Sequence, residues 1–117
     1  VLIDCGLSSW QYHKVCWKAG IDPRVTDILL THQHKDHSRG VFAAAERYDA
    51  TVHISTEALR SDSIVRLRRK VRHVRVKRYH LGEKFLLGPV YVEPFAVEHD
   101  APTVGFELDI PTAGGRV

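Results

Sequence analysis

The sequence predicts a mixed α/β fold, in which buried strands alternate with helices. The apolar run Ile28–Leu30 has the composition of a buried strand. The segment Ser8–Ala19 instead begins with a residue that can cap a helix and is followed by Gly20, which can end one. Alternating polar and apolar residues in 73–77 are typical of a strand with one wet face. Together these patterns indicate helices packed on sheets.

The composition is that of an ordinary globular protein. Of the 117 residues, 44% are hydrophobic and 26% are charged, which is enough for one small domain over residues 1–117 with a core of its own. No apolar run is long enough to span a bilayer, so no membrane partner is expected. Cys5 and Cys16 lack a C-x-x-C spacing, and we expect free buried thiols in a reducing, cytoplasmic compartment.

The first half of the chain is predicted to contain three strands and two helices. Residues 1–6 form a strand that carries Asp4 at its carboxyl end. In the helix that follows, candidates for the apolar side are Trp10, Val15 or Cys16, and Trp17. The strand 26–30 leads through a polar turn into a helix that begins near Ser38 and has an apolar stripe of Val41, Phe42, Ala45 and Tyr48. Residues 51–54 form a further short strand.

The second half is predicted to consist of one helix and several strands. The helix opens at Thr56, and residues 81–89 read as strand, turn, strand and turn. The long strand 90–98 contains Pro94, which is expected at an edge or in a bulge. Residues 104–110 are its partner strand, and 112–116 form a hairpin turn.

The stretch 31–40 carries the strongest chemical signal, because it contains His32, His34, Asp36 and His37 directly after a predicted strand. On an extended segment His32 and His34 point to the same side, where they can hold one metal ion. A turn would then bring Asp36 and His37 to a second ion. Two ions about 3.5–4 Å apart can activate a water and hold both the attacking and the leaving oxygen of a displacement. The pattern therefore predicts hydrolysis, with Asp36 and His37 as catalytic residues and ligands.

The remaining histidines of the first 80 residues are expected to be ordinary hydrogen-bonded or solvated residues. These are His13, His53, His73 and His80. A purely structural role for the central cluster is the alternative, which its spacing disfavours.

Residues 66–78 contain eight positive charges and no acid. One interpretation is a surface that tracks the phosphates of a polyanionic substrate. The candidate substrate residues are Arg66, Arg68, Arg69, Lys70 and Arg72. The alternative is a solvated helix face followed by an edge strand, where charges discourage pairing with another sheet.

The motif T-H-Q-H-K-D-H followed by Gly40 resembles the signature of the metallo-β-lactamase superfamily of metallohydrolases. Residues 1–6 are similar to the family's first motif, a strand that ends in Asp-x-Gly. Residues 97–106 are similar to its third motif, in which a histidine ends one strand and a Gly-aromatic pair opens the next. Within the superfamily, this last stretch most resembles the bacterial WalJ-type branch, which is associated with exonuclease activity on DNA; ribonuclease Z is a near relative.

The resemblance implies a four-layer αββα sandwich of two similar halves, with the first half and the start of the second in residues 1–117. It implies that His99 joins His32 and His34 as a third ligand of the first metal, and that Asp4 supports the ligands. The family's bridging aspartate and final histidine would lie beyond Val117. We expect Zn²⁺ as the cofactor, one or two ions, although the ligands also suit manganese or iron.

Two hypotheses of function follow. The first is a metal-dependent phosphodiesterase, most readily a nuclease that acts on DNA or RNA; the shared motif also leaves open hydrolysis of small esters, thioesters or lactams. The second is a non-catalytic fragment that needs a complementing chain or another copy of itself, as a homo-oligomer, to complete the site.

Overall fold

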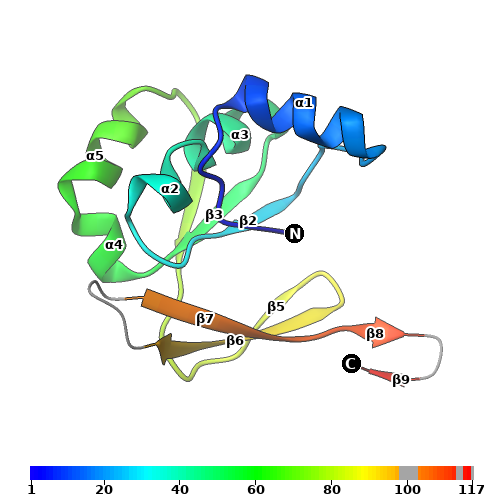
Figure 1. Cartoon of the computed structure of the whole chain (residues 1–117). Coiled ribbons are helices and arrows are strands. Elements are labelled where there is room, and N and C mark those ends of the chain that lie inside the picture. Colours follow the sequence, from blue (N-terminus) through cyan, green and yellow to red (C-terminus); the bar gives the residue numbers. More distant parts are fainter. Residues whose placement is uncertain (98–102, 113–114, 117) are drawn as a thin grey trace.

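The computed structural model describes residues 1–97, 103–112 and 115–116 of the chain. These residues form three layers, with helices on one face of a parallel sheet and an antiparallel sheet on its other face (Figure 1). The predicted mixed fold is thereby confirmed, and the layers match the first half of an αββα sandwich and the beginning of its second half.

The parallel sheet has the strand order β1-β2-β3-β4. Its strands are β1 (Leu2–Ile3), β2 (Asp27–Leu29), β3 (Thr51–Ile54) and β4 (Arg75–Arg78). The helices between them are α1 (Ser9–Ala19), α2 (Lys35–Ser38), α3 (Val41–Tyr48), α4 (Thr56–Arg60) and α5 (Asp62–Arg69). Strand β4 lies at an edge of this sheet, as the alternative interpretation of the basic segment expected. The helix expected from Thr56 is divided at Ser61, which is the C-cap of α4 and the N-cap of α5. None of the described helices is both long and apolar enough to cross a membrane.

The antiparallel sheet has the order β5-β6-β7. Its strands are β5 (Phe85–Leu87), β6 (Val90–Val97) and β7 (Thr103–Asp109), and a separate hairpin joins β8 (Pro111–Thr112) to β9 (Gly115–Arg116). The register of β6 with β7 runs without interruption from Tyr91 to Val97, so Pro94 causes no bulge. The pairing with β5 ends at Val92, and beyond it the Pro94 carbonyl accepts a hydrogen bond from Gly82 N–H (2.9 Å). Pro94 therefore lies beyond the end of the pairing with β5, where no neighbouring strand needs the backbone N–H that proline lacks.

The central strands β2 and β3 of the parallel sheet are buried on both faces, and their alternating side chains pack into two separate cores. Ile28, Val52 and Ile54 pack against the helices. Leu29 points the other way and packs against the antiparallel sheet at Val92. Strands covered on both faces are expected to be apolar throughout, which explains the run in β2.

Helix α1 has the predicted ends, but of the candidates for its buried face Cys16 alone is confirmed. Its N-cap Ser8 forms a capping box with Gln11, and Gly20 closes its C-terminus in the left-handed conformation. The buried residues are Tyr12 and Cys16, whereas the expected Trp10, Val15 and Trp17 are exposed. Tyr12 can be buried because its hydroxyl donates a hydrogen bond to the Pro23 carbonyl (2.7 Å).

Two hydrogen bonds hold the chain at the carboxyl end of β2, and the second of them joins the two sheets. The hydroxyl of the buried Tyr79 donates to the Leu30 carbonyl (2.7 Å), and Val104 N–H donates to the Thr31 carbonyl (3.1 Å). These bonds thus fix the backbone that follows β2 at the point where the histidine motif begins.

Candidate metal centre

The histidine motif lies at the carboxyl ends of β1 and β2, and its second half is helical. The predicted helix with the stripe Val41, Phe42, Ala45 and Tyr48 is α3, which begins at Val41. The predicted turn between His34 and that helix is the short helix α2, which begins at Lys35, and the backbone N–H groups of His37 and Ser38 both donate to the His34 carbonyl (2.9 and 3.0 Å). The Ser38 hydroxyl also donates to the Gln33 and His34 carbonyls (2.9 and 3.0 Å), which holds this tight turn in place.

The turn brings His32, Asp36 and His37 together. Their ligand atoms all lie within 4.8 Å of one another, and His37 Nε2 is 3.4 Å from Asp36 Oδ2. His32 is only 2% exposed, whereas the side chains of Asp36 and His37 are 78% and 38% exposed. The group therefore has a buried floor and an open side that a substrate can reach.

This donor set fits a divalent metal ion. Ligand atoms that share one Zn²⁺ at 2.0–2.1 Å are separated by up to about 4 Å, which is somewhat less than the 4.8 Å within which these three groups lie. Two imidazoles and a carboxylate also suit manganese and iron.

The grouping differs from the predicted division into two pairs. His32 was expected with His34, and Asp36 with His37, but His32 clusters with both members of the second pair. The ring of His34 lies beside that of His32, with 4.7 Å between the ring centroids. The predicted ligand His99 lies outside the described residues.

Asp4 supports the two clustered histidines, as predicted for a residue behind the ligands. One carboxylate oxygen accepts the backbone N–H of Thr31 (2.8 Å). The other accepts the Thr31 hydroxyl (2.6 Å) and lies 2.7 Å from His37 Nδ1. Because a carboxylate only accepts, Nδ1 of His37 must carry the proton, and Nε2 is the nitrogen for a metal.

Thr31 extends the same arrangement to His32, a role that the sequence reasoning missed. Its hydroxyl proton goes to Asp4, so its oxygen is left to accept from Nδ1 of His32, which is 2.9 Å away. The signal in the sequence was the position of Thr31 itself, between the strand and the first histidine.

Two glycines allow the loop after β1 to lie against the motif. A Cβ on Gly6 would be 2.1 Å from the Asp36 carbonyl oxygen, and a Cβ on Gly40 would be 1.6 Å from the Leu7 carbonyl oxygen. Between them, Cys5 N–H donates to the His37 carbonyl (2.7 Å) and Gly40 N–H donates to the Cys5 carbonyl (2.8 Å). The glycine positions of both motifs thus follow from close backbone contact.

Cys5 is a packed thiol. It is buried, its Sγ donates to the Leu7 carbonyl (3.4 Å), and burial raises the pKa of its thiol above the ordinary value. These surroundings disfavour a thiolate, the form that binds metals.

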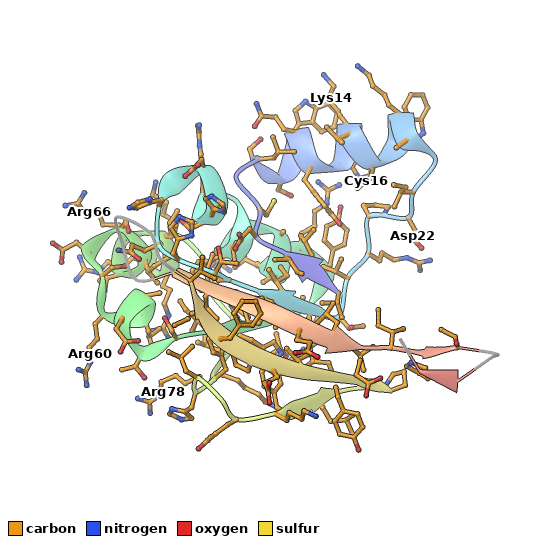
Figure 2. The ribbon with its side chains drawn as sticks, turned by 60° about the horizontal axis from the view of Figure 1, so that its bottom comes forward. Lys14, Cys16, Asp22, Arg60, Arg66 and Arg78 are labelled. Carbon is orange, nitrogen blue, oxygen red and sulfur yellow. The ribbon has the colours of Figure 1, made fainter. Side chains whose placement is uncertain are left out.

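The structure places some residues of the basic segment 66–78 beside the metal cluster and others away from it. Arg66 and Lys70 line a hollow of about 600 Å³ together with Asp36 of the metal cluster. Arg39, which the sequence reasoning did not single out, lines it as well. The predicted substrate residues Arg68, Arg69 and Arg72 are exposed but do not line this hollow. Figure 2 shows Arg66 on the side of α5, across the molecule from Asp22.

The predicted structural histidine His53 has the expected character. It is buried, its Nε2 lies 2.8 Å from Asp27 Oδ1, and its ring stacks on Phe85 with 5.5 Å between centroids.

The family described as the beta-lactamase superfamily domain matches residues 1–117. The chain is 28% identical over 102 residues to exodeoxyribonuclease WalJ of Streptococcus pneumoniae serotype 2 (strain D39 / NCTC 7466), covering 86% of this chain and 38% of that protein. It is equally similar to exodeoxyribonuclease YycJ of Bacillus anthracis, with the same coverage. The chain thus spans about 38% of the length of the curated relatives it matches.

Solved structures show the same fold. The Rm3 metallo-beta-lactamase superposes with a TM-score of 0.72 at 21% identity, over 98% of this chain and 48% of that one. A diphosphatase from the PhnP family superposes with a TM-score of 0.70 at 18% identity, over 91% of this chain and 42% of that one.

Proposed function

Because the chain belongs to the beta-lactamase superfamily domain family, we propose that it is part of a metal-dependent hydrolase that cleaves phosphodiester bonds in nucleic acid. DNA is the preferred substrate class, since two relatives are named exodeoxyribonucleases. The observation that carries the proposal is the contact between the His32–Asp36–His37 cluster and a hollow lined by cationic side chains, which meet at Asp36.

The metal site is proposed to use the predicted ligands His32, His34, Asp36, His37 and His99, with Zn²⁺ as the favoured ion. When bound, such an ion supplies a Lewis acid and lowers the pKa of a water near the substrate. The side chains of the chain prepare the site for it. Asp4 and Thr31 hold the imidazoles of His37 and His32 in one orientation and one tautomer.

The open side of the cluster is proposed to receive the substrate phosphate. Asp36 and His37 are its most exposed members and lie nearest to a bound substrate. The exposed carboxylate of Asp36 can also accept a proton from an attacking water, which fits its predicted catalytic role. Two buried free cysteines in the described part of the chain agree with a reducing, cytoplasmic location.

The test is cleavage of a fluorescently labelled DNA strand by the purified chain with added Zn²⁺ or Mn²⁺. We expect metal-dependent cleavage, and we expect His37→Ala to lower its rate by more than about 100-fold, because that change removes both a ligand and the partner of Asp4. His73→Ala is the matched control, since His73 is an exposed histidine outside the cluster. Hydrolysis of small esters or lactams without any cleavage of DNA or RNA would contradict the proposal.

A further inference from the structure

The hollow beside the metal cluster is more than an extension of the cluster. It is lined by Gly6, Asp36, Arg39, Ser63, Arg66, Leu67 and Lys70. Its volume of about 600 Å³ lies within the range of roughly 300–1,000 Å³ that is typical of small-molecule pockets. Such a space can take a sugar-phosphate unit, and Asp36 places it directly next to the metal ligands.

The register of α5 selects which basic residues reach the hollow. Ser63, Arg66, Leu67 and Lys70 are three or four residues apart and therefore share one side of the helix. Arg68 and Arg69 belong to the same basic last turn of α5 but lie on other sides of the helix. Arg39 enters from the end of α2, so cations approach the hollow from two separate elements.

The three cations of the hollow have no acidic partners among the described residues. Elsewhere Arg24 pairs with Asp22 (2.6 Å) and Arg75 pairs with Asp49 (3.0 Å). Arg39, Arg66 and Lys70 make no such pair within the described part of the chain. Their positive charge is therefore available to a ligand.

We propose that this hollow binds a second phosphate of the substrate, adjacent to the phosphodiester that is cleaved at the metal cluster. The inference rests on the proposed phosphodiesterase function and adds a substrate class to it, namely chains with at least two consecutive phosphates. Arginine forms paired hydrogen bonds with phosphate oxygens, and lysine adds a point charge. The two phosphates thus contact different residues. The histidines and Asp36 lie at the reacting phosphate, and Arg39, Arg66 and Lys70 bind the adjacent phosphate.

The test is binding of a fluorescently labelled single-stranded oligonucleotide, measured by fluorescence anisotropy in EDTA, so that no cleavage occurs. We expect Arg39→Gln, Arg66→Gln and Lys70→Gln each to weaken binding about five- to tenfold. Each should also reduce the slope of log K against log[salt] by about 0.7, the value for one phosphate contact on a single strand. The matched controls are Arg68→Gln and Arg69→Gln, which remove the same charge from the same helix and should change the affinity less than twofold.

Equal losses of affinity in both sets of variants would overturn the inference, because the basic segment would then attract the oligonucleotide only through its overall positive charge. Failure of the wild-type chain to bind the oligonucleotide at low salt would overturn it as well. The proposed hydrolysis can fail separately. If the hollow variants alone lose affinity but no metal supports cleavage, the phosphate site stands and the hydrolase proposal falls. If the DNA strand is cleaved but Arg66→Gln and Arg68→Gln bind it equally well, the hydrolase proposal stands and the phosphate site falls.

Discussion

Asp4 has an unusual backbone for a residue that is not glycine, with φ at +58°. Aspartate tolerates this left-handed conformation better than most residues do, but it still costs about 1 kcal/mol. The cost is offset by what the conformation allows. The carboxylate is turned toward Thr31 and His37 and takes part in three hydrogen bonds there. The strained residue is thus the one that organises the ligands.

Replacing this carboxylate tests its role directly. We expect Asp4→Asn to lower the affinity for Zn²⁺ by about 10- to 100-fold, because an amide lacks the negative charge that holds Nδ1–H of His37 and the Thr31 hydroxyl together. Competition with a chromophoric chelator measures the affinity. Asp22→Asn is the control, since Asp22 pairs with Arg24 at an exposed site. Wild-type affinity in Asp4→Asn, with an intact circular dichroism spectrum, would show that the ligands orient themselves.

At this scale the motif was predictable from the sequence and its grouping was not. The identities and positions of His32, Asp36 and His37 already indicated a metal site. Which of them share space depends on the path of the turn after His34. There the short helix α2 brings Asp36 and His37 close to His32.

Among the elements, the loop after β1 and helix α2 meet at backbone level. At Gly6 the space for a side chain is already occupied by the Asp36 carbonyl. We expect Gly6→Ala to lower the free energy of unfolding by about 1–3 kcal/mol, as overpacking does, and to weaken Zn²⁺ binding by displacing α2. Urea unfolding and zinc titration measure the two effects.

Gly82→Ala is the control for that experiment. Gly82 has a positive φ, at +78°, and a Cβ there would meet no atom within 4 Å. Its substitution should cost about 1 kcal/mol in backbone strain and leave Zn²⁺ affinity unchanged. If Gly6→Ala bound Zn²⁺ as tightly as Gly82→Ala, the contact with α2 would not position the ligands.

Helix α1 shows where pattern reading is limited at the scale of elements. Its ends were predictable, because capping is local chemistry between Ser8, Gln11 and Gly20. Its buried face was predictable at Cys16 but not at Tyr12, because hydrophobicity favoured Trp10 and Trp17 while packing buries Tyr12. A tyrosine can enter the core when a partner for its hydroxyl is in reach, and that partner, the Pro23 carbonyl, comes from beyond the helix.

For the whole molecule, the decisive feature is the junction of two sheets at the end of β2. The order of strands in each sheet follows the order of the strands in the sequence, with helices connecting the parallel strands. The junction does not, because it depends on contacts between residues far apart in the chain. Tyr79, which follows β4, donates to Leu30, and its ring packs edge-on against Phe106 of β7, with 5.2 Å between centroids. It therefore links both sheets directly beneath the metal site.

This junction predicts a loss of stability in alkali. Burial raises the pKa of Tyr79 above its usual range, whereas the same tyrosine in the unfolded chain ionises near pH 10. The unfolded state thus releases its proton first, so the Tyr79 contribution is fully present below about pH 10 and is lost as the pH rises through the raised folded-state pKa.

Urea unfolding of the wild type and of Tyr79→Phe between pH 8 and pH 11 isolates this contribution. The variant should be less stable by about 1 kcal/mol at pH 8, where it lacks the hydrogen bond to Leu30, but its stability should fall less steeply with pH. Other buried groups, such as Tyr12, whose pKa burial also raises, contribute to both proteins and cancel in the difference. Parallel pH dependences would mean that Tyr79 ionises without separating the sheets.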